Sequence, residues 1–319
     1  MAHYLVTGGA GFIGSHLADE LVRRGERVRV VDSLITGRRE NLAHLPAVEF
    51  VHGDLADAGV AEWAVRGIDY VLHQAAIPSV PRSVEDPVTS NRANIDASLN
   101  LLVAARDAKV KRVVYAGSSS AYGNTPTLPK VETMGTGPLS PYALQKLVVE
   151  QYARMFTDLY GLETVTTRYF NVFGPRQDPS SPYSGVISVF IKALHEGRQP
   201  TIYGNGEQTR DFTYVANVVD GVLRACHAPD ASGEVINVAT GGTISLNQLF
   251  RTLRDLLGAS GDPAYGPTRA GDVRDSQADI AKAKRLLGYE PIVSFEQGLA
   301  KTVAWYTASR LVQPATAGR

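Results

Sequence analysis

The stretch that decides the fold is "YLVTGGAGFIGSHLADELVRRG", residues 4–25. It opens with a short apolar run that is typical of a buried strand and closes with apolar residues at helical spacing. Gly8, Gly11 and Gly14 lie at the turn between the two. Glycine there permits a positive φ, lets backbone amides approach a pyrophosphate and allows the helix to pack closely. We therefore predict a strand–turn–helix unit that binds a dinucleotide, with the pyrophosphate at the helix N-terminus.

The same alternation of apolar runs and amphipathic stretches continues through the first half of the chain. Further strands are predicted at 27–31, 48–52, 69–73 and 111–117, and a long helix at 88–109. Successive strand–helix units favour an α/β fold, a Rossmann-type doubly wound parallel sheet with helices on both faces.

Two acidic residues follow predicted strands at the edge where a dinucleotide would lie. Asp32 is placed to accept hydrogen bonds from an adenosine ribose, and its charge would repel a 2′-phosphate, which favours NAD over NADP. Arg38 and Arg39 lie close enough in sequence to leave that preference open. Asp54 has two interpretations: it reads the adenine amino group, or it caps the helix that follows.

The chain divides into two predicted parts. Residues 1–170 form an NAD-binding Rossmann domain, to which about 211–240 contribute sheet and helix, and 171–319 form mainly a smaller C-terminal α/β substrate lobe. Its predicted elements are strands at 201–204 and 234–239 and helices at 246–258, 278–288 and 295–310, before a tail, 312–319, that looks disordered.

Composition excludes several classes of function. The 319 residues carry 32 Lys plus Arg and 32 Asp plus Glu without blocks of like charge, so we expect neither nucleic acid nor a membrane as partner. The histidines are not spaced with other ligands, which predicts no metal site. The one cysteine, Cys226, and the absence of a signal-peptide pattern or a long apolar run favour a cytoplasmic protein.

Two later motifs complete a series: "GSSSAYG" at 117–123 and "SPYALQK" at 140–146. By itself, a tyrosine four residues before a lysine is more often a surface contact than a catalytic pair. In order after the glycine turn, Asp32 and Asp54, however, these motifs make the chain similar to the extended short-chain dehydrogenase/reductase superfamily. Within it, the chain resembles the UDP-hexose (UDP-glucose and UDP-N-acetylglucosamine) 4-epimerases over nearly its whole length.

The resemblance implies tightly bound NAD that is regenerated in each cycle, a UDP-sugar substrate, and a homodimer through the helices that contain 99–103 and 147–152. It implies Ser118, Tyr142 and Lys146 as catalytic residues, with Ser119 the nearest rival to Ser118. The implied cofactor-binding residues are Gly8, Gly11, Phe12, Ile13, Gly14, Asp32, Asp54, Leu55, Ala75, Tyr142 and Lys146. The implied substrate-binding residues are Ser118, Ser119, Tyr142, Asn171, Arg210, Arg269, Asp272 and Ser276.

The chemistry explains why such a family uses a tyrosine with a lysine. Oxidising a sugar alcohol requires a base at the hydroxyl, and a tyrosine with a pKa near 10 costs about 4 kcal/mol to ionise at pH 7. A lysine ammonium and an oxidised nicotinamide each return about 3 kcal/mol at an effective dielectric constant of about 20. Lys146, one helical turn after Tyr142, and NAD⁺ would together offset the cost.

The residues after Ser118 indicate which reaction follows the oxidation. Family members that eliminate water or decarboxylate carry acidic residues there, whereas this chain has Ser119, Ser120 and Ala121. We therefore expect 4-epimerisation: C4 gives hydride to NAD⁺, the 4-keto sugar turns, and the hydride returns to the other face.

The sugar itself is less clear from the sequence. Ser276 stands where the family carries a residue that limits the size of the hexose 2-substituent, and a serine there predicts room for an N-acetyl group. Pro78, in the loop at 75–83, leaves open which sugar is preferred. The alternatives are a UDP-glucuronate 4-epimerase, with Arg82 or Arg176 on the carboxylate, or another nucleotide-sugar modifying enzyme of the same family. In another class, the alternative is a non-catalytic NAD-binding sensor.

Overall fold

The computed structural model describes residues 1–178, 185–268 and 274–309. Within them, seven parallel strands form the main sheet in the order β11–β6–β5–β4–β1–β2–β3. The strands are β1 (His3–Thr7), β2 (Arg27–Asp32), β3 (Glu49–His52), β4 (Tyr70–His73), β5 (Arg112–Ser118), β6 (Glu163–Tyr169) and β11 (Val235–Val238). The predicted doubly wound Rossmann-type sheet is confirmed, and the strand order reverses between β1 and β4.

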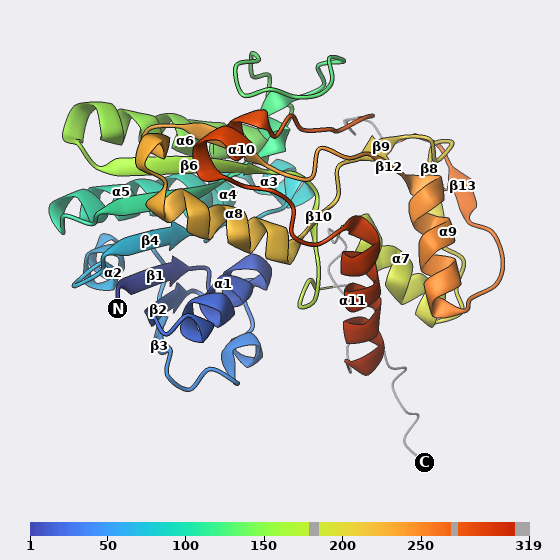
Figure 1. Ribbon diagram of the computed structural model, residues 1–319, viewed down its shortest axis with the longest axis horizontal. Coiled ribbons are helices and arrows are strands. Elements are labelled where there is room, and N and C mark those ends of the chain that lie inside the picture. The colour runs from blue at the N-terminus through green and yellow to red at the C-terminus, as the bar shows by residue number, and fades with distance from the viewer. Residues whose placement is uncertain (179–184, 269–273, 310–319) are drawn as a thin grey trace.

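Helices cover both faces of this sheet (Figure 1). One face carries α1 (Phe12–Arg23), α8 (Val215–His227) and α10 (Ala281–Leu287), and the other carries α2 (Ala58–Ala64), α5 (Ala97–Asp107) and α6 (Pro141–Tyr160). Apolar residues one helical turn apart, such as Leu17 and Leu21 of α1, are buried against the sheet. The sheet and its helices thus form a rigid base for the ends of the strands.

The predicted long helix at 88–109 is confirmed as a continuous run of helical turns, and the type of helix changes inside it. After α3 (Val80–Glu85), it consists of α4 (Pro87–Asn91), a π-helical segment, η2 (Arg92–Asp96), and α5. A π segment carries an extra residue in its turn, and such segments are frequent at functional sites. Here the segment contains Asn94, which is buried and hydrogen-bonded to the backbone of Ile77.

The smaller lobe lies beside the sheet, at the right of Figure 1. The helices α7 (Val186–His195), α9 (Leu246–Leu257) and α11 (Phe295–Ala308) share one apolar core. Three short strand pairs in the described residues form separate two-stranded sheets: β7 (Val172–Phe173) with β10 (Thr213–Tyr214), β9 (Thr209–Arg210) with β12 (Ile244–Ser245), and β8 (Thr201–Tyr203) with β13 (Ala264–Gly266).

Besides α8, two elements that follow residue 170 pack with the main sheet. β11 pairs with β6, within the segment predicted to contribute there, whereas α10 was assigned to the substrate lobe and instead packs on β11 and α8. The short helices η1 (Arg39–Leu42), η3 (Ser119–Tyr122) and η4 (Pro229–Ala231) complete the described chain. None of the described helices is long and apolar enough to cross a membrane. The tail predicted as disordered lies outside the described residues.

Candidate active site

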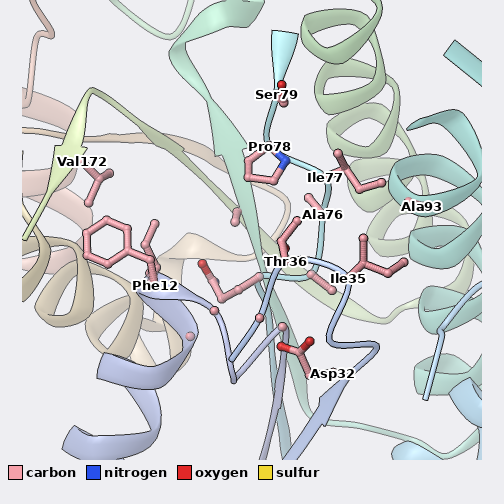
Figure 2. Close-up of a pocket in the computed structure, with 18 of the residues that line it drawn as sticks. Phe12, Asp32, Ile35, Thr36, Ala76, Ile77, Pro78, Ser79, Ala93 and Val172 are labelled. Carbon is pink, nitrogen blue, oxygen red and sulfur yellow. The ribbon is translucent and has the colours of Figure 1, made fainter. Parts of the chain in front are cut away.

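A cavity of about 900 Å³ lies at the carboxyl ends of the central strands. Its lining comes from the residues after β1, β2, β4 and β5, from the start of α6, and from the segment after β6. Figure 2 shows one part of this lining, where Ile35 and Thr36, which follow β2, lie near Ala76–Ser79, which follow β4. Open α/β sheets bind ligands where the strand order reverses, and this cavity lies at that point.

The glycine turn builds the floor of the cavity. Gly8 has φ +64°, and a Cβ there would lie 2.8 Å from the backbone nitrogen of Ala75. A Cβ on Gly14 would lie 2.3 Å from the carbonyl oxygen of Gly8, so α1 packs on the turn more closely than any side chain allows. Gly11 caps α1 without a side-chain hydrogen bond. Backbone amides at the start of this helix can therefore be approached by a diphosphate, and the arrangement fits a dinucleotide.

Asp32 lies at the end of β2 and lines the cavity. Its carboxylate accepts hydrogen bonds from the backbone nitrogens of Ala10 (2.9 Å) and Leu34 (2.8 Å). Burial raises the pKa of Asp32, and these hydrogen bonds oppose the rise. Arg38 pairs with Asp178 at 2.5 Å, and Arg39 lies over the ring of Phe50, so the described contacts of both arginines are made elsewhere than at Asp32.

The structure decides against one of the two interpretations of Asp54. The side chain that caps α2 is Asp57, which accepts from the backbone nitrogen of Gly59 at 2.8 Å. Asp54 instead closes a local turn by accepting from Ala56 at 2.9 Å, and it lines the cavity with Leu55. The helix-cap interpretation is therefore wrong, and contact with adenine stays a prediction.

Tyr142 and Lys146 enter the cavity from the first turns of α6. The helix begins there because Ser140 accepts a hydrogen bond from the backbone of Ala143 and Pro141 occupies the first turn. Ser118, at the end of β5, lines the same cavity, and its side chain favours the ionised form of the Tyr142 phenol, which opposes the rise of its pKa. The Lys146 ammonium donates to the carbonyl oxygen of Ala116 at 2.9 Å. The end of β5 and the start of α6 thus bring these three residues to one cavity.

Burial shifts both titratable groups of this trio away from their charged forms. It raises the pKa of Tyr142 to about 12, against the hydrogen bond from Ser118, and lowers the pKa of Lys146 to about 8. Ionising the phenol at pH 7 then costs about 7 kcal/mol, since each pKa unit is worth about 1.4 kcal/mol. A lysine charge worth about 3 kcal/mol is not enough alone, so a second positive charge in the cavity is required.

The predicted sugar-nucleotide residues fall into two groups. Asn171 lines the cavity, and its amide donates to the carbonyl oxygen of Asp211 at 3.2 Å. Arg210 and Ser276 are not part of the lining. Arg210 donates to the carbonyl oxygen of Arg274, and the Ser276 nitrogen to that of Thr209, in an adjoining pair of loops. Arg269 and Asp272 lie outside the described residues.

The remaining predicted residues, Phe12, Ile13, Ala75 and Ser119, all line the cavity. The prediction missed several residues of the loops after β2 and β4, and one serine and one tyrosine near the trio. These are Ile35, Thr36, Gly37, Gln74, Ala76, Ile77, Ser79, Ser120 and Tyr169. The loops could have been found from the rule that ligands bind at the carboxyl ends of strands.

The two arginines considered for a carboxylate substrate differ. Both line the cavity, but the Arg176 guanidinium is held by Asp19, the His16 ring and the carbonyl oxygen of Asn41. Arg82 is therefore the better placed of the two. Among the described residues, no three His, Cys, Asp or Glu side chains are grouped to hold a metal ion.

Comparison with known proteins agrees with this geometry. Residues 4–239 match the model of the NAD dependent epimerase/dehydratase family. A UDP-glucose 4-epimerase of Mycolicibacterium smegmatis is 40% identical over 310 residues, which cover 95% of this chain and 97% of that protein.

Two solved structures are similar over 96% of the chain. A UDP-N-acetylglucosamine 4-epimerase from Methanobrevibacter ruminantium, in complex with UDP-N-acetylmuramic acid, has a TM-score of 0.92 at 41% identity, with 98% of that chain covered. A UDP-glucose 4-epimerase from Thermus thermophilus, in complex with NAD, has a TM-score of 0.88 at 36% identity, with 99% of that chain covered.

Proposed function

This chain belongs to the NAD dependent epimerase/dehydratase family, and we propose that it is an enzyme that epimerises a UDP-hexose at C4 with NAD as its cofactor. The observation that carries the proposal is the meeting of Ser118, Tyr142 and Lys146 in the cavity whose floor is the glycine turn. NAD fits this floor because Gly8 and Gly14 let the turn pack against Ala75 and α1, so that the backbone amides at the start of α1 lie open to a diphosphate.

Tyr142 acts as the base that removes the proton of the sugar 4-hydroxyl. Ser118, which lines the cavity with the phenol, holds the same sugar oxygen and keeps it within reach of the base. Lys146 supplies one positive charge beside the phenol. Bound NAD supplies the second charge and the acceptor, then the donor, of the hydride at C4. The cost of about 7 kcal/mol for ionising Tyr142 makes the base active only when the cofactor is in place.

The rest of the loop argues for simple return of the hydride. η3 follows Ser118 with Ser119, Ser120 and Ala121, so no acid stands there to protonate a departing hydroxyl. The Ser118 hydroxyl is 2.8 Å from that of Ser120, which keeps the pair in a local turn. A 4-keto sugar formed in this cavity can therefore be reduced on its other face, with UDP held by Asn171 and Arg210, and by Arg269 and Asp272 in the segment outside the described residues.

We propose that the sugar is UDP-glucose or UDP-galactose, and also the N-acetylated pair. The support is the family resemblance, which places Ser276 beside the hexose 2-substituent, where a small side chain would leave room for an N-acetyl group. A uronate is the second candidate, favoured by the position of Arg82 on the cavity wall. Pro78, next to Ile77 on the cavity wall, leaves open whether the plain or the N-acetylated hexose is preferred.

We also propose a cytoplasmic homodimer. The outer faces of α5 and α6 expose large apolar side chains, among them Val103, Met155 and Leu159, which a second copy would cover. Cys226 is buried and free, which suits a reducing compartment.

The experiment is a coupled assay of the purified protein against four UDP-sugars: glucose, N-acetylglucosamine, galactose and glucuronate. We expect epimer formation without net production of NADH, and NAD in the supernatant after denaturation. Conversion of glucuronate alone would select the second candidate. Stoichiometric NADH without any epimer would overturn the proposal, and ligand binding without turnover would support a sensor instead.

A further inference from the structure

Gln145 lies between Tyr142 and Lys146 on α6, yet no catalytic role falls to it. Its side chain is 4% exposed. The amide oxygen accepts two hydrogen bonds, from the Ser90 hydroxyl of α4 and from the Asn94 amide of the π-helical segment, both at 2.8 Å. A buried oxygen with two donors from other elements ties α6 to its neighbours at one turn from the base.

The tie continues to the cavity wall. The Asn94 side-chain oxygen accepts from the backbone nitrogen of Ile77 at 2.7 Å, and Ile77 lines the cavity beside Pro78 and Ser79 (Figure 2). One buried amide pair therefore links the helix that carries the base to the loop that faces the ligand. The π-helical segment is what places Asn94 between the two.

The same network reaches the cofactor side. The Ser98 hydroxyl donates to the carbonyl oxygen of Asn94 at 2.5 Å and contacts the His73 ring at 2.8 Å. His73 in turn contacts the Thr7 hydroxyl at 2.7 Å, at the end of β1. The Ser98 hydroxyl has one proton, which it donates to Asn94, so the His73 Nε2 must donate to Ser98. Every side chain of this hydrogen-bond series therefore has a partner.

A second anchor holds the start of α6. The backbone nitrogen of Tyr142 belongs to the first turn of the helix, where no intrahelical acceptor exists. It donates to the Ser83 hydroxyl of α3 at 3.0 Å, and Ser83 is fully buried. The position of Tyr142 is thus set at its own backbone by α3 and, three residues later, by Gln145.

We propose that Gln145 is a positioning residue, which holds the Tyr142 base at a fixed distance from the 76–79 wall through Ser90, Asn94 and Ile77. The inference rests on the function proposed above. Small displacements of a catalytic group cost rate rather than binding, because the reacting atoms must be held within about 3 to 3.5 Å. The loss of this link therefore lowers kcat and leaves KM and the NAD content almost unchanged.

The test compares Gln145→Met with wild type. Methionine keeps the length of the side chain but accepts neither hydrogen bond, so Ser90 and Asn94 lose their partner. We expect kcat to fall about tenfold to a hundredfold, KM to stay within about twofold, and amide exchange at Ile77 to become faster. Gln145→Glu keeps an acceptor oxygen, and it is expected to restore most of kcat while raising the kinetic pKa of the base through its added negative charge.

Thr164→Val is the matched control. Thr164 is buried and its hydroxyl donates to the carbonyl oxygen of Ala153 at 2.7 Å, so the variant loses a buried hydrogen bond of α6 at the end far from Tyr142. It should lower the melting temperature about as much as Gln145→Met and leave kcat unchanged. An equal fall of kcat in both variants, or an unchanged kcat in Gln145→Met, would overturn the inference. A wild-type protein without epimerase activity would instead reject the proposed function, while the Ile77 exchange would still report the link.

Discussion

The two halves of the site are built in different ways. The cofactor half is the glycine turn with Asp32, and the sugar-nucleotide half is the set of loops that carry the predicted residues Asn171, Arg210 and Ser276. In the cofactor half, the glycine turn and Asp32 come from one continuous stretch, and their contacts join residues near in sequence, such as Asp32 with Ala10 and Leu34. In the sugar-nucleotide half, residues more than sixty positions apart must be brought together. The first half depends on the shape of a local turn, and the second on a few side chains that tie loops to one another.

Asp211 shows how the second half is tied. Its buried carboxylate accepts four hydrogen bonds, from the backbone nitrogens of Thr240, Gly241 and Ala278 and from the Thr240 hydroxyl. Asp275 does the same on the other side of Arg210, by accepting from the backbone and hydroxyl of Thr209. The chain next to Arg210 is therefore held by two carboxylates rather than by a turn.

The largest effect is expected where the cofactor half is tightest. Gly14→Ala would place a Cβ 2.3 Å from the backbone oxygen of Gly8, so α1 must move away from the turn. We expect the variant to retain no NAD and to show no measurable turnover, as judged by cofactor release on denaturation and by the coupled assay. Gly135→Ala, where a Cβ meets open space, is the control and should keep both. Full NAD retention in Gly14→Ala would show that the turn does not form the floor.

Tyr142→Phe tests the point where the two halves meet. Loss of the phenol removes the base and should lower kcat by about a hundredfold or more, with NAD retained. Tyr160→Phe, on the same helix but 52% exposed, is the matched control and should have the wild-type rate. A non-catalytic sensor would instead keep its ligand response in this variant. An unchanged kcat would show that Tyr142 is not the base.

Lowering the pH should change the contributions of His73 and Asp211 to the free energy of unfolding in opposite directions. Burial lowers the pKa of His73, in the cofactor half, to about 3, so the unfolded chain binds a proton there that the folded chain does not, and stability falls as the pH drops below about 6.5. Burial raises the pKa of Asp211, so protonation there is favoured in the folded state. Between pH 6.5 and 5, His73 should account for a loss of about 2 kcal/mol in the free energy of unfolding.

Urea unfolding at the two pH values measures this loss. His73→Gln should lose about 2 kcal/mol less than wild type over that interval, whereas His195→Gln, in the smaller lobe and partly exposed, should behave as wild type. If all three proteins lost the same unfolding free energy between the two pH values, His73 would not be held neutral by the fold.

The smallest effect concerns the ties of the sugar-nucleotide half. Asp211→Asn turns one acceptor oxygen into a donor that faces other donors, so the loops that carry Arg210 and Asn171 should shift. We expect KM for the UDP-sugar to rise about tenfold, or about 1.4 kcal/mol, with NAD retention unchanged. Asp255→Asn, on an exposed side chain, is the control. If NAD were lost together with sugar affinity, the two halves would not be separable.

The sequence predicted local features better than contacts between distant elements. The strands around the glycine turn and the α/β class are confirmed, because apolar period and turn glycines are local properties. The helix at 88–109 is confirmed, but its π-helical turn at Asn94 was not predicted, because the partners of Asn94, Ile77 and Gln145, come from other elements. The packing of α10 was not predicted, because its apolar residues are compatible with either part of the molecule and only the contacts with β11 and α8 show which part it covers. The cap of α2 is Asp57 and not Asp54, because the helix begins three residues later than the cap interpretation of Asp54 requires.

By itself, the sequence determined the sheet, its dinucleotide turn and the residues worth considering as base, activator and hydroxyl partner, since each is marked by a motif within a few positions. Only the tertiary structure decided that Ser118, Tyr142 and Lys146 line one cavity, that burial raises the pKa of the base instead of lowering it, and that Gln145 links the catalytic helix to the cavity wall. The reason is physical: desolvation and buried hydrogen bonds depend on what surrounds a side chain, and those neighbours come from distant parts of the chain.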